Sequence, residues 1–415
     1  MTNVLPGLAA AVWVWQVLLG VALLGTASST TFLFLLLAAA LRYRREARMS
    51  QAAAVSTPES SLPPVTILKP IHGMEPRLEE NLDSFFLQDY PEFEIVIGAR
   101  DADDLGLKVA EQVRRRHPQV KSRIVLSGPP TWPNAKVFSL DKMLAVSSNS
   151  YLVPSDSDTR VGRDLLRNLI PSLLDPKVGL VTCPYRGVPA PGFGSSLEAL
   201  GMSVEMTSGV IVADMVEGMR FALGPVIAVR RDALEAIGGF ASVADYYSDD
   251  FELGSKIWAA GYKVVLSHYV VGHVLLPRPF WRTVGDQLRW MKSTRYSRPK
   301  GHLGTGLTFA MPFGVLGLLA SVALGDSPLG WWLFGAAWAN RIIQALAVGW
   351  GIIRDPRLLA LCWLYPLRDL LGFFIWVGSF ASRSFFWRGE VYSFSDGGKI
   401  VPQDRPTESA VAQRL

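Results

Sequence analysis

Two pairs of carboxylates in this 415-residue chain have a spacing that can do chemistry. Asp156 and Asp158 flank one serine just after a short apolar run, so both side chains point to the same side of an extended backbone. Such a pair can hold one divalent cation, Mg²⁺ or Mn²⁺, and the cation can bridge a diphosphate leaving group. The second pair, Asp249 and Asp250, enters a predicted helix. There Asp249 suits helix capping, and Asp250 can act as a general base.

Basic and aromatic residues accompany these acids. Arg289 and Trp290 end the stretch that begins at Asp286, just before an apolar region. An arginine there can clamp a diphosphate or a lipid head group, and a tryptophan offers a stacking face. Lys69, Lys136 and Arg289 are candidate counter-charges for the negative groups, and a solvated role is the alternative for each lysine.

The elements that must position these residues alternate between short apolar runs and helical patterns. The predicted strands are Val65–Leu68, Phe93–Gly98, Arg123–Leu126, Tyr151–Val153 and Val178–Thr182. Alternation of this kind predicts an α/β fold with a mostly parallel sheet that is covered by helices. Ligands of such sheets bind beyond the carboxyl ends of the strands. The residues that follow the strands are Lys69, Arg100 to Asp104, Asn134 to Lys136, and Asp156 to Asp158. We therefore expect the carboxylates and lysines to meet at one rim of the sheet.

Motifs and composition exclude several other classes of protein. The strand ends carry no Gly-x-Gly-x-x-Gly or Walker sequence, which disfavours a dinucleotide fold and a P-loop ATPase. Lys and Arg number 41 against 36 Asp and Glu. This excess is too slight to imply nucleic acid, and a basic rim facing anionic lipid explains it better. Cys183 and Cys362 are far apart and in unlike surroundings, which argues against a disulfide framework and for a reducing compartment.

The N-terminus is predicted to be an uncleaved membrane anchor. Only 19% of the residues are charged, and the mean hydropathy is +0.24. Residues 1–41 contain no Asp, Glu, Lys or Arg, and four arginines follow at 42, 44, 45 and 48. A secretory signal would carry its positive charge before the apolar run. We expect one long, tilted span in spite of the polar segment Thr26–Thr31, with the arginines in the cytoplasm.

The C-terminal third contains further apolar stretches. They cover about Leu307–Leu324, Leu329–Ile353 and Leu358–Phe380. Arg341, Arg368 and Asp369 lie inside them and need partners or a wet cavity. Three spans would place the C-terminus outside, whereas Arg383, Arg388 and Lys399 favour the inside; a re-entrant or interfacial segment at 365–371 is the alternative.

The predicted organisation has five parts. They are a membrane anchor with its basic flank (1–50), a linker (51–63), a cytoplasmic catalytic domain (64–300), C-terminal membrane helices (301–385) and a tail (386–415). Within the catalytic domain, Ser195–Val216 together with Phe280 and Trp281 can lie at the membrane interface and guide a lipid. A buried core helix is the equal alternative for this stretch.

The ordered motifs between about Pro64 and Arg298 resemble those of ceramide glucosyltransferases and of bacterial hopanoid-biosynthesis glycosyltransferases. The matching residues are Leu68-Lys-Pro70, Gly73, Asn81-Leu82, Phe85-Phe86, Asp89-Tyr-Pro91, Asp101-Ala-Asp-Asp104, Asn134-Ala-Lys136, Asp156-Ser157, Asp249-Asp250 and Arg289-Trp290. The resemblance implies an inverting glycosyltransferase of family 21 type with the GT-A fold, a UDP-sugar donor, a membrane lipid acceptor and a divalent cation.

The resemblance also implies roles for single residues. Asp104 matches an aspartate that contacts the nucleoside, Asp156 one near the metal and the diphosphate, and Asp250 the proposed base. Donor binding is accordingly expected at Lys69, Asp101, Asp104, Lys136 and Asp156, and metal binding at Asp156 and Asp158. Arg289 and Trp290 match the end of a (Gln/Arg)-x-x-Arg-Trp motif for the acceptor or the diphosphate. Its first position is Asp286 here, which departs from the animal enzymes, and Gln287 is the candidate for that role.

The expected function is transfer of one sugar from a UDP-sugar to a lipid hydroxyl, with ceramide as the expected lipid. The expected location is a membrane, crossed several times, with the catalytic domain in the cytoplasm, as in a bacterial inner membrane. A hopanoid or diacylglycerol acceptor is the first alternative. A processive polysaccharide synthase, which needs a channel of several spans, is the second, and a non-enzymatic receptor or scaffold for nucleotide sugars is the third. The sugar itself stays open at this stage.

Overall fold

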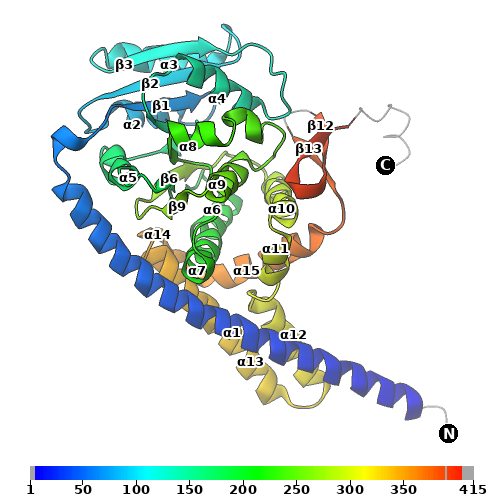
Figure 1. Cartoon of the computed structure of the whole chain (residues 1–415). Helices are drawn as coiled ribbons and strands as arrows, with labels where there is room; N and C mark the ends of the chain where they lie inside the picture. Colours follow the sequence, from blue (N-terminus) through cyan, green and yellow to red (C-terminus); the bar gives the residue numbers. More distant parts are fainter. Residues whose placement is uncertain (1–4, 388–389, 404–415) are drawn as a thin grey trace.

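A seven-stranded sheet forms the centre of the computed structural model, which describes residues 5–387 and 390–403 (Figure 1). Its strands are β1 (Val65–Pro70), β2 (Phe93–Ala99), β3 (Lys121–Leu126), β4 (Tyr151–Pro154), β6 (Val178–Thr182), β8 (Ile227–Arg230) and β9 (Lys263–Leu266). They lie in the order β3-β2-β1-β4-β8-β6-β9. Only β8 is antiparallel to its neighbours within this sheet. The prediction of an α/β fold with a mostly parallel sheet is confirmed.

Helices cover both faces of this sheet. One face packs against α2 (Leu78–Phe86), α3 (Leu105–Arg116) and α5 (Leu165–Leu173), and the other against α4 (Ala135–Val146), α8 (Arg231–Ala236) and α9 (Asp249–Ala259). Ile67 of β1 belongs to the first core, and its neighbour Leu68 belongs to the second. Successive side chains of a strand point to opposite faces, so each strand contributes to both cores. This is why the strands read as continuous apolar runs in the sequence.

Two smaller sheets and several short helices complete the described chain. β5 (Thr159–Arg160), β10 (Val271–Val274) and β7 (Tyr185–Val188) form one sheet, and β11 (Ser384–Trp387), β12 (Glu390–Phe394) and β13 (Ile400–Pro402) form the other. The short helices are η1 (Glu59–Ser61), η2 (Gly201–Met206), η3 (Phe240–Val243), η4 (Ala345–Trp350), η5 (Cys362–Leu364) and η6 (Asp396–Gly398). The elements η2 and η4 are π-helical.

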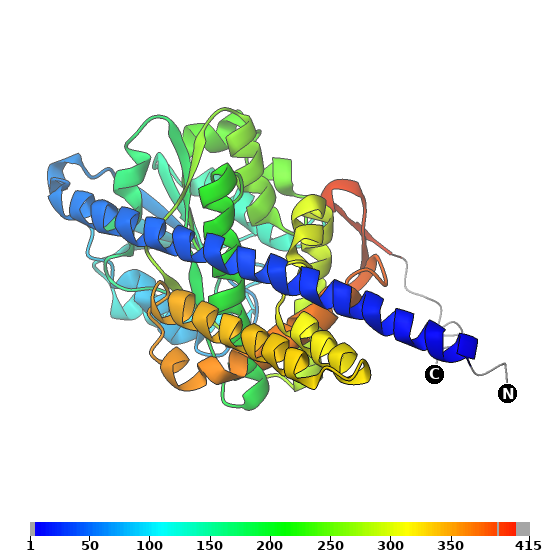
Figure 2. The same cartoon turned by 90° about the horizontal axis from the view of Figure 1, so that it is seen from below.

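The first helix, α1 (Leu5–Ser56), both enters the membrane region and belongs to the catalytic domain. Its N-terminal half projects beyond the domain, and its C-terminal half crosses the underside of the domain (Figure 2). Tyr43 is buried there and donates a hydrogen bond to the carbonyl of Ser267 at 2.8 Å. The helix therefore continues to Ser56, into the segment 51–63 that we expected to be a linker, because packing on the domain stabilises it.

Two apolar helices of the C-terminal third form a hairpin beside α1 (Figure 1). They are α12 (Met311–Ala323) and α13 (Ser327–Gln344), which η4 continues. A Cβ atom on Gly314 would lie 2.5 Å from the Cβ of Ala337, so the two backbones approach closely only because both residues are small. The hairpin returns the chain to the side from which it left.

The polar segment Thr26–Thr31 of α1 lies against this hairpin region. Ser28 Oγ donates to the carbonyl of Leu307 at 2.6 Å, and Asn340 Nδ2 donates to the carbonyl of Ser29 at 3.3 Å. These hydrogen bonds satisfy polar groups that would be costly against lipid. One continuous helix through this segment agrees with the expected long span.

Three described helical stretches are long and apolar enough to cross a membrane: Val12–Ser56, Phe193–Glu217 and Arg357–Gly378. The second comprises α6 (Phe193–Leu200), η2 and α7 (Thr207–Glu217), and the third comprises α14 (Arg357–Leu361), η5 and α15 (Tyr365–Gly378). In the most apolar window of the second stretch 61% of the residues are buried, so much of it packs inside the protein, while Phe193 at its start is 57% exposed. With 13 residues, α12 is shorter than the roughly 20 that a span needs.

The segment expected as a tail folds back onto the catalytic domain. In the described part, Phe385 and Phe394 pack their rings against Tyr247, at centroid distances of 5.3 and 5.8 Å. The backbone N–H of Ile400 donates to the carbonyl of Asp245 at 2.8 Å. Arg388 and residues 404–415 lie outside the described chain. Thus β11–β13 and the catalytic domain lie together, which simple counting of three C-terminal spans does not allow.

The charged residues inside the apolar stretches are paired. Arg341 and Asp369 are 2% and 3% exposed and form an ion pair at 2.9 Å, and Arg368 pairs with Glu205 at 2.9 Å. The second oxygen of Asp369 accepts the backbone N–H groups of Ala310 and Met311, which begin α12. The sequence had left open whether these charges are paired or face a wet cavity, and the ion pairs answer that question.

Replacement of Asp369 by alanine should destabilise the protein by about 3–5 kcal/mol, the usual cost of removing one partner of a buried ion pair. Arg341 would be left unpaired and α12 would lose its N-terminal acceptor. Thermal unfolding in detergent measures the loss. The matched control is Asp326→Ala, which removes an exposed cap of α13 and should cost about 1 kcal/mol. The double variant Arg341→Met with Asp369→Leu should recover most of the stability; equal losses in Asp369→Ala and Asp326→Ala would contradict this assignment.

Candidate active site

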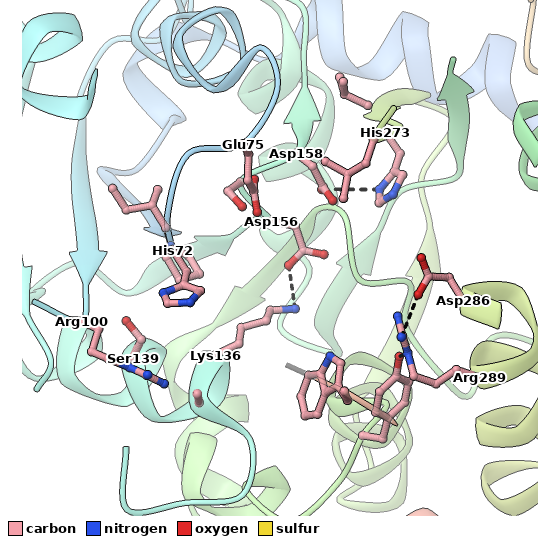
Figure 3. Close-up of a pocket in the computed structure, with 18 of the residues that line it drawn as sticks. His72, Glu75, Arg100, Lys136, Ser139, Asp156, Asp158, His273, Asp286 and Arg289 are labelled. Carbon is pink, nitrogen blue, oxygen red and sulfur yellow. Dashed lines mark hydrogen bonds and ion pairs between the residues drawn. The ribbon is translucent and has the colours of Figure 1, made fainter. Parts of the chain in front are cut away.

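A pocket of about 350 Å³ opens at the carboxyl ends of β1 and β4 (Figure 3). Its first half is built from strand-end residues, among them His72, Lys136, Asp156 and Asp158. Its second half comes from β10, α6, β11 and α10 (Phe280–Ser297). Of the acids and lysines that we expected at this rim, Lys136, Asp156 and Asp158 line the pocket, and a later part of the chain closes it.

Lys136 lies between acids from two separate elements. Its Nζ is 2.7 Å from Asp156 Oδ1 and 3.1 Å from Asp249 Oδ2. Burial alone would lower the pKa of Lys136, but the negative charges of Asp156, Asp249 and Asp250 outweigh burial and raise it. The ammonium group is therefore a fixed positive charge in the pocket.

Asn134 explains why this lysine is so well placed. Its side-chain oxygen caps α4 by accepting the N–H groups of Lys136 and Val137, while Nδ2 donates to Asp249 Oδ1 at 3.2 Å. The Asn-Ala-Lys sequence thus connects the start of α4 to the start of α9. Asp249 was expected as a helix cap, and its carboxylate instead pairs with Lys136 and accepts from Asn134.

Asp158 faces His273 of β10 across the pocket (Figure 3). Asp158 Oδ1 lies 3.5 Å from His273 Nδ1, and both atoms are buried without a hydrogen-bond partner in the described chain. Glu75 Oε2, also in the pocket, is a third such atom. Burial raises the pKa of Asp158, His273 counteracts this, and Asp156 adds to it. These atoms need a ligand that the protein does not supply.

A divalent cation fits these unpaired atoms. Among residues 5–387 and 390–403, no three His, Cys, Asp or Glu side chains are gathered closely enough to enclose a metal ion. Mg²⁺ usually binds through one or two carboxylates together with substrate phosphates, and such an open site needs no closed cluster. Asp156 and Asp158 are the residues that would hold the ion, together with phosphate groups of the donor.

Asp250, the second residue of α9, has its carboxylate next to Gly224 and is not among the residues that line the pocket. A Cβ atom on Gly224 would lie 3.0 Å from Asp250 Oδ2 and 3.5 Å from Asp156 Oδ2, so both carboxylates face this glycine. Burial, followed by the charge of Asp249, raises the pKa of Asp250 to about 7, although Lys136 opposes the shift. A carboxylate with such a pKa is suited to take up a proton near neutral pH.

Replacement of Gly224 by alanine should lower kcat about 10-fold, because small displacements of reacting groups cost rate steeply. The added methyl group would press against Asp250 Oδ2 and move the carboxylate by a few tenths of an ångström. Donor KM and the unfolding midpoint should change little. Gly209→Ala on α7 is the control, since its Cβ would enter open space. Unchanged kcat in Gly224→Ala would show that this carboxylate position is not critical.

Three of the predicted donor-binding residues, Lys69, Asp101 and Asp104, do not line the pocket. Lys69 is fully buried below the rim and donates to Ser155 Oγ (3.2 Å) and to the carbonyl of Asp156. Burial lowers its pKa to about 7 in spite of the nearby Asp156 and Asp158. Lys69 thus positions the Asp156–Asp158 loop and does not line the pocket.

The cluster 101–104 also supports the pocket from outside. Asp104 caps α3 and accepts the backbone N–H of Gly73, whose φ of +68° favours glycine. It thereby fixes the loop that carries His72 into the pocket. Asp101 is exposed, and Arg100 lines the pocket beside it. Nucleoside contact by Asp104 stays a prediction.

The Arg-Trp motif lies where it was expected, on α10 facing the pocket. Arg289 is 2.8 Å from Asp286 Oδ1, and its Nε donates to Tyr247 OH at 2.6 Å. Trp290 lines the pocket. Gln287 is buried, its Oε1 has no hydrogen-bond partner in the described chain, and it does not line the pocket. Asp286 therefore orients Arg289, a role that the motif comparison did not suggest.

Sequence reasoning missed several residues of this pocket, among them Glu198, Tyr247, His273 and Trp387. Tyr247 lies just before Asp249 and Asp250, and the spacing of these acids gives no indication of a role for the tyrosine. His273 has a weak signal, because it lies in a short strand late in the domain. Glu198 is hidden in an apolar helix, and Trp387 follows the membrane helices, so no local pattern connects either residue with the sheet.

An acidic pocket at the carboxyl edge of a mostly parallel sheet is typical of α/β enzymes. The profile described as Glycosyl transferase family 21 matches residues 30–400, so the chain belongs to this family and is a glycosyltransferase. It is 23% identical to ceramide glucosyltransferase 3 of Caenorhabditis elegans, over 83% of this chain and 75% of that protein. It is 37% identical to a ceramide glucosyltransferase of Komagataella phaffii, over 26% of this chain and 22% of that protein.

Solved structures of other glycosyltransferases are similar to this chain. The mannosyltransferase PcManGT of Pyrobaculum calidifontis, in complex with GDP-Man and Mn²⁺, is 21% identical with a TM-score of 0.43; the match covers 84% of this chain and 99% of that one. TarS 1–349 of S. aureus, in complex with UDP-GlcNAc, is 14% identical with a TM-score of 0.39, covering 82% of this chain and 99% of that one.

Proposed function

We propose that this membrane glycosyltransferase moves one sugar from a UDP-sugar to the hydroxyl group of a ceramide-type lipid, with inversion at the anomeric carbon. One observation carries the proposal: the pocket that holds Asp156 and Lys136 is walled on its other side by α6, the start of the apolar stretch Phe193–Glu217. A polar donor and a lipid can therefore reach one cavity. The names of the family-21 relatives support ceramide as the acceptor.

The residues divide the chemistry between them. Asp250, deprotonated, takes the proton of the lipid hydroxyl as this oxygen attacks the anomeric carbon. Lys136 and Arg289 offer positive charge to the diphosphate that leaves, and Trp290 offers a flat face to the arriving groups. Asp156 and Asp158 would hold a divalent cation. When bound, such a cation neutralises charge that develops on the diphosphate.

The same arrangement supports a topology. Four arginines follow the apolar half of α1, and the positive-inside rule favours a cytoplasmic catalytic domain. The hairpin α12–α13 enters from that side and returns to it, and β11–β13 pack on the catalytic domain. The C-terminal strands then lie in the cytoplasm as well, as Arg383 and Lys399 suggest.

Purified protein incubated with UDP-sugars and lipids tests the proposal by mass spectrometry of the products. The donors are the UDP forms of glucose, N-acetylglucosamine, glucuronic acid and galacturonic acid; the lipids are ceramide, a hopanoid and diacylglycerol. We expect a ceramide that carries one sugar. Transfer to a hopanoid or to diacylglycerol alone would overturn the acceptor assignment. Products with several sugars would favour a processive synthase instead.

A further inference from the structure

Glu198 is a pocket carboxylate that the proposed chemistry leaves unused. It lies on α6, is 8% exposed and lines the cavity. Within the described residues its carboxylate has no hydrogen bond and no ion pair closer than 4.0 Å. A buried carboxylate without a partner is costly, so a ligand that completes it would contribute binding free energy.

The groups around Glu198 restrict what that ligand can be. Its electrostatic neighbours are Asp286, His273, Arg368 and Arg278. Both cations are occupied, since Arg278 pairs with Asp286 and Arg368 pairs with Glu205 at 2.9 Å. Asp286 pairs with both Arg278 and Arg289, so Glu198 is left without a cationic partner at this end of the pocket. Burial, followed by the charge of Asp286, raises the pKa of Glu198 to about 7, and a ligand that offers N–H or O–H groups would favour its ionised form, which only accepts hydrogen bonds.

The position of Glu198 in the fold points to the acceptor lipid. Its helix continues through η2 and α7 as an apolar stretch, whereas the donor half of the pocket is formed by the opposite strand ends. Phe193, five residues before Glu198, is 57% exposed, and Trp281 on the adjoining α10 is 78% exposed. Exposed aromatic side chains of this kind suit a membrane interface.

We propose that Glu198 selects the acceptor by accepting a hydrogen bond from a second donor group of the lipid, next to the hydroxyl that receives the sugar. This inference rests on the proposed function. Ceramide carries such donors, an amide N–H and a secondary hydroxyl beside its primary hydroxyl. Diacylglycerol carries only ester oxygens there, which repel a carboxylate. Glu198 is thus a specificity residue, and Asp250 remains the base.

The test compares wild type with Glu198→Gln in two assays. The first measures equilibrium binding of fluorescent short-chain ceramide and diacylglycerol in detergent, without donor. We expect the variant to bind ceramide about 10- to 100-fold more weakly, which is the range for a hydrogen bond to a charged group. Binding of diacylglycerol should become stronger, because the charge that repels its ester oxygens is removed, so the preference between the lipids should collapse. UDP-sugar binding, the second assay, should also stay unchanged and shows that the variant is folded.

Glu235→Gln on α8 is the matched control, because it removes an exposed carboxylate away from the pocket. An equal loss for both lipids, an unchanged preference, or a wild type without preference would each overturn the inference. Sugar transfer is measured separately. A wild type that transfers no sugar but whose ceramide preference depends on Glu198 would overturn the proposed function and leave this inference standing.

Discussion

Replacement of Asp250 by asparagine should lower kcat about 10²- to 10⁴-fold, which is the usual contribution of a general base. Asparagine keeps the size of the side chain next to Gly224 but cannot take up a proton. Binding of the UDP-sugar should change little, because the proposed contact of Asp250 is with the acceptor hydroxyl and not with the donor. Turnover and donor binding, measured on the same preparation, separate the two effects.

The pH profile gives this prediction a second readout. The pKa of Asp250 is raised to about 7, so its carboxyl group is protonated and inactive below that pH. The rate of wild type should therefore rise as the pH increases through about 7 and then level off, and Asp250→Asn should lose this rise. Asp245→Asn, an exposed acid nearby, is the control and should keep the wild-type profile. Near-normal turnover in Asp250→Asn would exclude Asp250 as the base.

The sheet was predictable because its signals are local. The strands β1, β2, β3, β4 and β6 contain short apolar runs, and the first four are each followed by helical spacing, so a mostly parallel sheet follows from the alternation. The strand β8, which is antiparallel, escaped the prediction, since nothing within Ile227–Arg230 indicates its direction. Hydropathy likewise marked the C-terminal helices. It does not reveal that two of them form a hairpin, because that depends on small residues such as Gly314 meeting Ala337.

The acids of the site were predictable for a similar reason, and their supporting residues were not. Asp156 and Asp158 follow a strand, and such positions meet at one edge of a parallel sheet. Lys69 shows the limit of this argument, because the same position rule placed it in the pocket while its side chain turns inward to Ser155. Trp387 is separated from the sheet by the membrane helices, so only the folded chain brings it to the pocket.

The pairing of Asp158 with His273 leads to the second large effect. Both residues have a buried atom without a hydrogen-bond partner in the described chain, and burial raises the pKa of Asp158. A cation bound there displaces the proton from Asp158, so its affinity should fall as the pH decreases. Lys136, 2.7 Å from Asp156, is the competing source of positive charge. Chelation of divalent cations distinguishes a bound cation from Lys136 as the source of positive charge.

Removal of divalent cations with EDTA should stop sugar transfer, and added Mn²⁺ should restore it. Asp158→Asn should raise the Mn²⁺ concentration for half-maximal rate at least about 10- to 100-fold, since even loss of a supporting partner of a ligand costs that much. Binding of Mn²⁺ to the protein with UDP, followed by electron paramagnetic resonance, measures the same loss without turnover. Asp175→Asn, an exposed acid, should leave both values unchanged. Full activity in EDTA would instead assign the neutralisation of the diphosphate to Lys136, and Lys136→Met would then be the variant that abolishes transfer.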